Sequence, residues 1–317
     1  MEEKIPVIAV VGPTASGKTG LAVEIAKRFG GEVVSADSMQ IYSELSVGTA
    51  KPTDEEMSGI PHHLVGFLSI SEEYSVANYV DDAKKAVAEI CKNGKLPVIC
   101  GGTGLYVDSL LTNTEFSEIK SDPKLRESLF AFAEEKGREA LFERLKKADP
   151  ETADKLHFNN LGRVVRALEV YEITGKPISE HQKLSRSVPS PYDVCYIGTS
   201  YRDREKLYSK IEKRIDTMLS KELLDEARFV FEHDEHGTAA QAIGYKEFYP
   251  YFRGESTLDE AIELLKKETR HYAKRQLTWF RRNEKINWIY WDDYDSKDEV
   301  YNTVFKIIEE HWRKNEK

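Results

Sequence analysis

Hydrophobic residues in the first third of the chain alternate between short continuous runs and the spacing of an amphipathic helix. The continuous runs at 7–11 and 96–100 are typical of buried parallel strands, and 32–37 is predicted to be a further short strand that ends in an acid. The spaced stretches predict helices over 21–29, 75–92 and 105–111. This βαβαβ succession predicts a parallel sheet with right-handed crossovers.

The pattern changes after Leu111. Residues 120–186 contain no convincing strand, and helices are predicted over 124–135, 138–147 and 161–174. Strand patterns return at 193–199 and 287–292, with helical spacing over 202–231, 258–280 and 300–312. We therefore expect an α/β core of residues 1–118 and 193–317, interrupted by a mostly helical insertion of residues 119–192. The Pro-containing segment 185–191 is predicted to be the return linker.

A glycine-rich motif joins the first predicted strand to the first predicted helix. It matches the full phosphate-loop pattern and comprises Gly12, Pro13, Thr14, Ala15, Ser16, Gly17, Lys18 and Thr19. Glycines let backbone N–H groups point at phosphate oxygens, and the helix N-terminus adds its positive dipole end. Lys18 supplies a cation, and the Thr19 hydroxyl can ligate Mg²⁺. The motif predicts a P-loop NTPase-like core with a polyphosphate site, and it leaves the identity of the ligand open.

Two polar residues follow predicted strands, at the sheet edge where ligands bind in doubly wound folds. Asp37 ends the second strand. It either faces the ligand crevice or caps a helix, and its position favours neither. Thr103 follows Gly101 and Gly102, which allow the backbone to approach a ligand closely. The Thr103 hydroxyl is either a helix N-cap or a group of the site.

A pair of histidines, His62 and His63, raises the question of a metal site. No third ligand lies at a useful spacing from the pair. The pattern therefore favours structural, hydrogen-bonded histidines over metal ligands.

Composition narrows the classes of function. The 317 residues are 40% hydrophobic, which supports a sizeable core, and no stretch approaches the length of a membrane span. The N-terminus resembles neither a signal peptide nor a transit peptide. Three scattered cysteines, without a Cys-x-x-Cys pair, argue for a reducing compartment and against disulfides or a cysteine zinc site. We expect a cytoplasmic protein that is a monomer and does not bind membranes.

Charge is unevenly distributed along the chain. The net charge of −9 argues against a protein that coats nucleic acid. The segment 269–285 is nevertheless basic and carries Arg270, Lys274, Arg275, Arg281, Arg282 and Lys285 against Glu284 alone. Aromatic residues interleave with these cations, a pattern that suits RNA because aromatics stack on unpaired bases. Spacing alone leaves open the alternative of a core helix with a solvated basic edge.

The phosphate loop and the acid at position 37 fit two other classes of protein. A small-molecule or nucleoside kinase would use Asp37 as a base and would turn over ATP without RNA. A non-catalytic RNA-binding P-loop protein would keep the basic segment and would tolerate the loss of Asp37.

Seven motifs, in order, resemble those of the bacterial tRNA dimethylallyltransferases, also called tRNA isopentenyltransferases. The match runs from Pro6 to about Trp288. Its motifs are 12–19, Asp37-Ser-Met-Gln-Ile-Tyr42, Gly48-Thr-Ala-Lys-Pro52, Gly101-Gly-Thr-Gly-Leu-Tyr106, Arg163-Val-Val-Arg-Ala-Leu-Glu169, Ala242-Ile-Gly-Tyr-Lys-Glu247 and Lys274-Arg-Gln-Leu-Thr-Trp-Phe-Arg281.

The resemblance implies transfer of a dimethylallyl group from dimethylallyl diphosphate to N6 of an adenosine in tRNA. The adenosine is that at tRNA position 37, 3′ of the anticodon, in tRNAs that read codons beginning with U. The products are N6-dimethylallyladenosine and diphosphate. The partners implied are the anticodon stem-loop and the prenyl donor, with Mg²⁺ as cofactor.

The resemblance also implies roles for individual residues. Asp37 and Thr103 are catalytic, with Asp37 as general base, and Arg214 joins the phosphate loop in binding the donor. The insertion is expected to grip the anticodon stem-loop. The expected tRNA contacts are Asp37, Ser38, Met39, Gln40, Thr103, Arg126, Asn159, Asn160, Leu161, Gly162, Arg163, Lys274, Arg275, Arg281 and Arg282.

The sequence departs from the usual family pattern in three respects. Ser43 stands where an arginine is common, so it is assigned no tRNA contact. His157-Phe-Asn-Asn160 replaces His-Pro-Asn-Asp, which affects the contacts expected at 159–160. No zinc-finger pattern follows residue 290, so we expect the bacterial rather than the long eukaryotic form.

Overall fold

The computed structural model describes residues 4–116, 119, 121–185, 188–233, 237 and 239–315. The chain divides into two compact units, which are described separately. The core unit comprises Met1–Leu111 and Pro191–Lys317, and the insertion unit comprises Thr112–Ser190. These bounds differ from those expected at 118/119 and 192/193. Pro191 belongs with the core because its carbonyl accepts a hydrogen bond of 2.9 Å from the N–H of Ile5, at the start of the first strand.

The core unit contains a parallel sheet, which confirms the expected α/β class. Six strands lie in the order β3-β2-β4-β1-β5-β6, and every neighbouring pair is parallel. Val10 of β1 pairs with Cys100 of β4 on one side and with Ile197 of β5 on the other. The strands are β1 (Ile5–Val11), β2 (Gly31–Ser35), β3 (His62–His63), β4 (Leu96–Gly101), β5 (Tyr192–Ser200) and β6 (Asn287–Tyr290).

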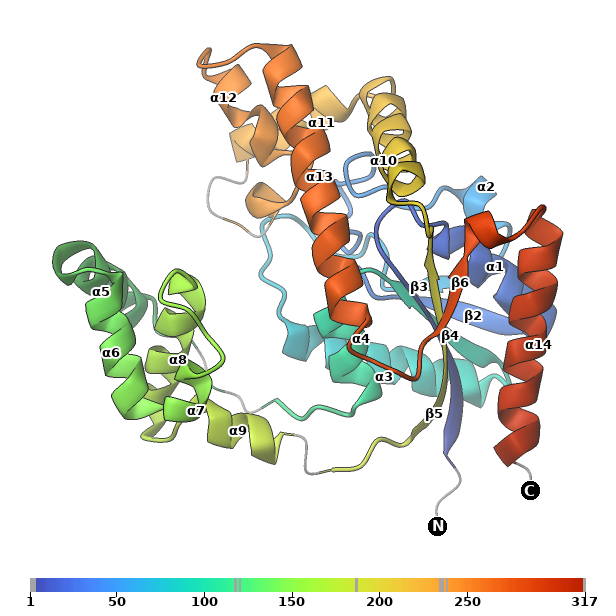
Figure 1. The fold of residues 1–317 in the computed structure, drawn as a ribbon, viewed down its shortest axis with the longest axis horizontal. Helices are drawn as coiled ribbons and strands as arrows, with labels where there is room; N and C mark the ends of the chain where they lie inside the picture. The colour runs from blue at the N-terminus through green and yellow to red at the C-terminus, as the bar shows by residue number, and fades with distance from the viewer. Residues whose placement is uncertain are drawn as a thin grey trace. The chain divides into compact units, whose positions relative to one another are not determined.

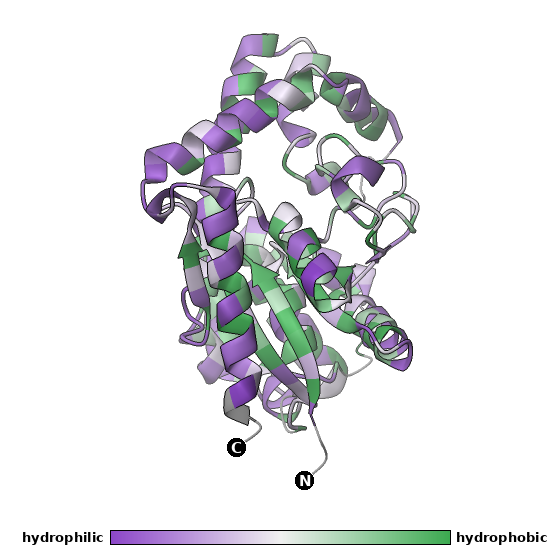
Figure 2. Ribbon diagram, turned by 90° about the vertical axis from the view of Figure 1, so that its right-hand side faces the viewer, coloured by the Kyte–Doolittle hydropathy of each residue, from purple (hydrophilic) through white to green (hydrophobic). Residues whose placement is uncertain are grey.

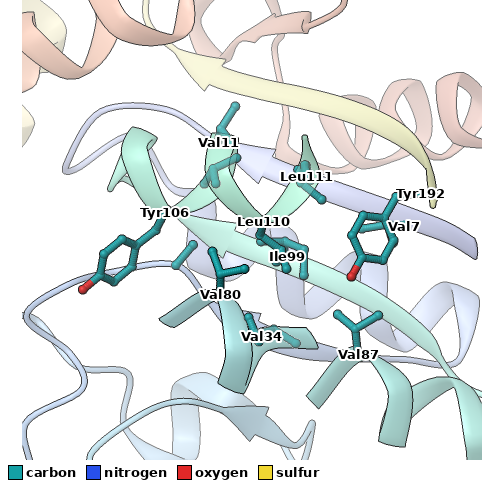
Figure 3. Close-up of a cluster of buried hydrophobic side chains, with 14 of the residues drawn as sticks. Val7, Val11, Val34, Val80, Val87, Ile99, Tyr106, Leu110, Leu111 and Tyr192 are labelled. Atoms are coloured by element: carbon teal, nitrogen blue, oxygen red, sulfur yellow. The ribbon is translucent and has the colours of Figure 1, made fainter. Parts of the chain in front are cut away.

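Helices cover both faces of this sheet (Figure 1). On one face, α3 (Val76–Lys92) and α4 (Gly104–Leu111) pack against the strands, and Figure 3 shows Val80, Val87 and Leu110 meeting Val34 and Ile99. On the other face, α1 (Lys18–Phe29) and α14 (Lys297–Asn315) bury side chains against Ile8, Val10 and Ile197. Figure 2 accordingly shows hydrophobic strands behind helices whose outer faces are hydrophilic.

The core unit also contains a helical lobe, which has a hydrophobic cluster of its own. Its two longest helices, α10 (Arg204–Leu219) and α13 (Leu258–Phe280), pack against each other, and they also pack against the loop after β2 through Ile41, Tyr42 and Leu45. Through these contacts, the segment that follows β2 packs against helices from the last third of the chain. Its shorter elements are α11 (Leu223–His233), α12 (Tyr249–Phe252), η1 (Ala239–Gln241) and η2 (Lys246–Phe248).

The remaining elements of the core are short. A four-residue helix, α2 (Asp54–Met57), has a capping box in which the Thr53 and Glu56 side chains each bond the other's backbone N–H. A 3₁₀ turn, η3 (Trp291–Asp293), follows β6. Among the described residues, no helix combines the length and the apolar character that a membrane span requires.

The insertion unit is helical, as its sequence pattern predicted. Leu129, Leu141, Leu145, Val165 and Leu168 form its buried core. Its helices are α5 (Pro123–Lys136), α6 (Arg138–Ala148), α7 (Pro150–Ala153), α8 (Leu161–Thr174) and α9 (Ile178–Leu184). Part of the predicted linker, residues 186 and 187, lies outside the described residues.

Several predicted bounds were wrong for local reasons. The second strand ends at Ser35 rather than Asp37 because a turn begins after Ala36. The helix expected over 202–231 is two helices, because Glu222 has a left-handed φ of 69°. The strand expected over 287–292 stops at Tyr290, where η3 begins.

Candidate active site

The phosphate loop connects β1 to α1 in a conformation that its glycines make possible. Gly12 and Gly17 have φ of 149° and 79°, which side chains rarely allow. A Cβ on Gly12 would lie 2.3 Å from the carbonyl oxygen of Thr199, so the backbone of β5 closes that space too. Ala15 also has a left-handed φ of 59°, which is strained for a residue other than glycine. The surrounding contacts therefore have to hold the loop in place.

Neighbouring elements supply those contacts. The Ser16 hydroxyl is buried and lies 2.9 Å from the Thr199 hydroxyl of β5. The Trp291 indole N–H donates to the Ser16 carbonyl over 2.7 Å. Lys18 Nζ donates to the Pro13 carbonyl over 2.6 Å, across the mouth of the loop. The Ser16 side chain is thus engaged by the scaffold rather than pointing at a ligand.

Lys18 lies in an environment that favours an anion beside it. Burial lowers the pKa of Lys18 from 10.5 to about 8, and Arg214 lowers it further, while Cys100 and Asp37 oppose the shift. A bound polyanion would stabilise the charged form of the ammonium group.

A cavity of about 430 Å³ opens beside the loop and contains most of the predicted site. The loop contributes Thr14, Ala15, Lys18 and Thr19 to its lining. The end of β2 and its turn contribute Asp37, Ser38, Met39 and Gln40. Arg214 and Arg275 enter from the helical lobe. Among the residues predicted to bind the donor, Gly12, Pro13, Ser16 and Gly17 do not line the cavity.

Asp37 faces the cavity, the first of the two alternatives that its sequence position left open, and it caps a turn instead of a helix. Its Oδ1 accepts hydrogen bonds from the N–H groups of Met39 at 3.0 Å and Gln40 at 3.4 Å. The segment is a turn rather than a helix. Oδ2 has no hydrogen-bond partner within the part of the chain that the structure describes. The turn therefore fixes the carboxylate and leaves one oxygen available at the cavity.

Arg214 extends from α10 into the same cavity. Burial lowers the pKa of its guanidinium, although Asp37 and Glu56 act in the opposite direction. Within the described ranges, Arg214 makes no hydrogen bond and no ion pair. A partly desolvated guanidinium without a partner is a strong site for a diphosphate.

Thr103 holds the glycine-rich loop after β4 against the Asp37 turn. Its Oγ1 accepts from the N–H of Ser38 at 3.1 Å, and its own N–H donates to the Ala36 carbonyl at 3.1 Å. A Cβ on Gly101 would lie 2.1 Å from that same carbonyl, so glycine is required there. Thr103 itself does not line the cavity, whereas Gly101 and Gly102 do.

Apolar side chains form one wall of the cavity, and sequence reasoning did not assign them to a site. Ile211, Ile215 and Met218 lie on the face of α10 that also carries Arg214, and Leu223 and Leu265 complete the wall. Their spacing was visible, but a helical apolar stripe is indistinguishable from ordinary core.

Two polar residues of α13 were missed as site residues. Tyr272 and Gln276 lie one helical turn apart and line the cavity. Burial and Asp37 raise the pKa of Tyr272, so its hydroxyl remains protonated and able to donate. Gln276 stands within the motif 274–281, where the interleaved cations gave no sign of its role.

The predicted basic segment is not one uniform surface. Arg275 lies 5.7 Å from the centre of the Tyr272 ring and lines the cavity. Arg282 lies 4.1 Å from the centre of the Trp279 ring, so its charge is already engaged. Lys274 and Arg281 are exposed and, like Arg282, lie outside the cavity lining.

The histidine pair is hydrogen-bonded, as the sequence pattern favoured. His63 Nε2 lies 2.7 Å from Glu32 Oε2, and His62 Nδ1 lies 2.8 Å from the Ile60 carbonyl. Throughout the described ranges, no three histidine, cysteine or acidic side chains are grouped to hold a metal ion.

In the insertion unit, the predicted tRNA contacts at 159–163 line a hollow together with Arg138. Arg138 and Arg163 are exposed. Arg126 lies 3.4 Å from the buried carboxylate of Glu169, which also accepts from Arg166 and Ser121. Burial opposes ionisation of Glu169, but these bonds lower its pKa overall.

Comparison with known proteins gives a consistent result. The family model described as IPP transferase matches residues 40–283. A tRNA dimethylallyltransferase of Acetivibrio thermocellus is 51% identical, covering 94% of this chain and 96% of the relative. One of Caldanaerobacter subterraneus subsp. tengcongensis is 48% identical, covering 96% and 98%.

Solved structures agree with the sequence relatives. The full-length tRNA isopentenylpyrophosphate transferase of Bacillus halodurans is 41% identical and superposes with a TM-score of 0.73, covering all of both chains. A eukaryotic dimethylallyltransferase acting on tRNA is 30% identical, with a TM-score of 0.78 over 93% of this chain and 78% of that one. The chain belongs to the IPP transferase family.

Proposed function

We propose that this protein is a tRNA dimethylallyltransferase that moves the dimethylallyl group of dimethylallyl diphosphate to N6 of adenosine. The acceptor is the adenosine at tRNA position 37, in tRNAs that read codons beginning with U. The observation that carries the proposal is the meeting of Lys18, Arg214 and Asp37 at one cavity with an apolar wall. The two cations suit a diphosphate, the carboxylate suits a proton-donating amine, and the apolar wall suits a short hydrocarbon chain.

The two cations and the loop amides suit the leaving group. The bond between the allylic carbon and the diphosphate oxygen breaks, and negative charge builds up on the oxygens that leave. Lys18 and Arg214 bind this charge together with the N–H groups of residues 15–19. The apolar wall of Ile211, Ile215 and Met218 supports the hydrocarbon part and excludes water.

Asp37 suits the role of general base. The N6 amine of adenine is a weak nucleophile because its lone pair is delocalised into the ring. As N6 forms its bond to the allylic carbon, one N6 proton passes to the free Oδ2 of Asp37. The Met39 and Gln40 N–H groups hold the other oxygen, so the carboxylate keeps its orientation throughout. Thr103 supports the same turn through Ser38.

The residues at the cavity fit a divalent ion bound mainly by its substrate. Thr19 offers a hydroxyl at the cavity, beside Lys18, and the free Oδ2 of Asp37 is left for the N6 proton. Mg²⁺ prefers such hard oxygen ligands and completes its octahedron with phosphate oxygens and water. When bound, Mg²⁺ would supply further charge stabilisation for the departing diphosphate.

The tRNA contacts are proposed from several surfaces. A base extruded from a single-stranded loop can enter the cavity at a cost of only about a few kcal/mol. Lys274 and Arg281 are free to meet phosphates, and on the insertion unit Arg138 and Arg163 flank the hollow at the start of α8. We propose that this hollow binds the backbone of the anticodon stem-loop.

A transfer assay tests the proposal. Purified protein, Mg²⁺ and labelled dimethylallyl diphosphate are mixed with an unmodified anticodon stem-loop bearing adenine at position 37, and ATP serves as an alternative donor. We expect label in the RNA, and none when that adenine is replaced by guanine. Release of phosphate from ATP without labelled RNA would instead support a kinase.

A further inference from the structure

The side chain of Gln276 bridges two loops of the site. Its Oε1 accepts a hydrogen bond of 2.8 Å from the N–H of Thr14, in the phosphate loop. Its Nε2 donates over 2.9 Å to the carbonyl of Gly102, in the loop after β4. Because one partner can only donate and the other can only accept, the network defines which way the amide faces.

The bridge is tightly enclosed. Gln276 is 5% exposed, and a Cβ on Gly102 would lie 2.2 Å from its Nε2. On the next turn of α13, Trp279 packs on Gly104 in the same way, and its indole N–H donates to Asp108 over 2.8 Å. The amide thus packs closely against Gly102 at the wall of the cavity, and α13 is fastened to α4 just beyond it.

The loop on the far side of Gln276 is fastened in turn to the Asp37 segment. The N–H of Thr103 donates to the Ala36 carbonyl, and the Thr103 hydroxyl accepts from the Ser38 N–H. A continuous run of hydrogen bonds thus leads from the phosphate loop, through Gln276, to the residues on either side of Asp37.

We propose that Gln276 is a positioning residue that sets the distance between the donor's diphosphate and the base at Asp37. This inference rests on the proposed prenyl transfer. The reaction requires the amine, the allylic carbon and the leaving oxygen to be aligned, and misplacing reacting groups by about 1 Å can reduce the rate about 100-fold. Gln276 holds the phosphate loop and the loop after β4 at a fixed separation, and it does not itself touch the reacting atoms.

The first test uses Gln276→Met, which keeps the volume and removes both hydrogen bonds. We expect kcat for transfer to fall about 10- to 100-fold, while KM for the tRNA stem-loop changes little. The Thr14 amide loses its acceptor, so hydrogen exchange of residues 12–19 should accelerate about tenfold, as the loss of one hydrogen bond predicts. Exchange needs no turnover, so this result is independent of the proposed function.

The second test uses Gln276→Glu, whose protonated acid can reproduce both bonds of the amide. Its carbonyl oxygen accepts from Thr14, and its O–H donates to Gly102. The ionised form loses the donor and repels the Gly102 carbonyl. Activity relative to wild type at the same pH should therefore rise as the pH falls from 8.5 to 6, whereas the ratio for Gln276→Met should stay constant.

A matched control carries the same added charge on the solvent side of the same helix. Leu264 of α13 is 39% exposed, so Leu264→Glu should show a ratio near one at every pH. Wild-type activity within twofold in a folded Gln276→Met, or a flat ratio for Gln276→Glu, would overturn the positioning role. If wild type transfers no label at all, the proposed function fails, and the exchange measurement still decides whether Gln276 holds the loop.

Discussion

The hydroxyl groups of Ser16 and Thr199 lie 2.9 Å apart, and both residues are completely buried. This hydrogen bond joins the phosphate loop to β5, a strand that follows the insertion in the sequence. It explains how a loop with a strained residue, Ala15, is held by the sheet rather than by its ligand.

Thr199→Val should destabilise the core by about 1–3 kcal/mol, because it leaves the Ser16 hydroxyl buried without a partner. Adding Ser16→Ala removes that stranded group, so the double variant should be less destabilised than the sum of the single changes. Urea unfolding of the four members of the cycle measures this coupling. Strict additivity would show that the hydroxyl pair contributes no coupling.

Asp37→Asn should lower turnover about 10²- to 10⁴-fold, the usual contribution of a general base. The asparagine keeps an Oδ1 acceptor for Met39 and Gln40, so the turn and tRNA affinity should persist. Single-turnover transfer to the stem-loop, with binding measured separately, checks both parts. Undiminished transfer by the variant would remove Asp37 from the role of base.

The affinity for inorganic diphosphate should depend on the ionisation of Lys18. The pKa of Lys18 is lowered to about 8, mainly by burial, so the unliganded chain loses this charge as the pH rises through that value. If the charged form binds, the apparent Kd at pH 9 should be about tenfold weaker than the value below pH 7. Diphosphate should also bind with proton uptake above pH 8.

Lys18→Arg provides the reference for that titration, because a guanidinium stays charged across this range. The ionisation of diphosphate itself affects both proteins equally and cancels in the ratio of their Kd values. Calorimetry from pH 6.5 to 9.5 should show this ratio changing near pH 8. A constant ratio would mean that Lys18 does not change its charge there.

Salt should weaken tRNA binding steeply, and the exposed cations of α13 and of the turn that follows it should account for part of the slope. Lys274→Ala should reduce the slope of log Kd against log salt by about one for the phosphate contact it removes. Arg282→Ala should reduce it less, because the Arg282 guanidinium already lies over Trp279. Equal effects of the two changes would show that the Trp279 contact opens when tRNA binds.

Local patterns predicted the parts of the fold that depend on neighbouring residues. The phosphate loop was recognisable because its glycines, Lys18 and Thr19 are contiguous and lie between a strand and a helix. The parallel sheet followed from repeated strand-helix alternation. By contrast, β3 contains two residues, too few to show a period. Its two histidines raised the question of a metal site and gave no sign of a strand.

The parts of the site that sequence alone could not place come from distant segments. Spacing alone predicts that Arg214 is a solvated helix residue, and only the family resemblance suggested a ligand. Gln276 gave no signal because its two partners lie far away in the chain, and the motif around it is dominated by cations. Patterns along a helix show which face is apolar, but not which loop that face will meet.

The bond between Gln276 and Thr14 spans 262 residues of chain. During synthesis at about 5–20 residues per second, the phosphate loop emerges roughly 13–52 s before the residue that braces it. A nascent chain therefore carries a recognisable phosphate-binding motif without a complete donor site. The proposed donor site is therefore assembled only near the end of translation, after α10, α13 and β6 have emerged.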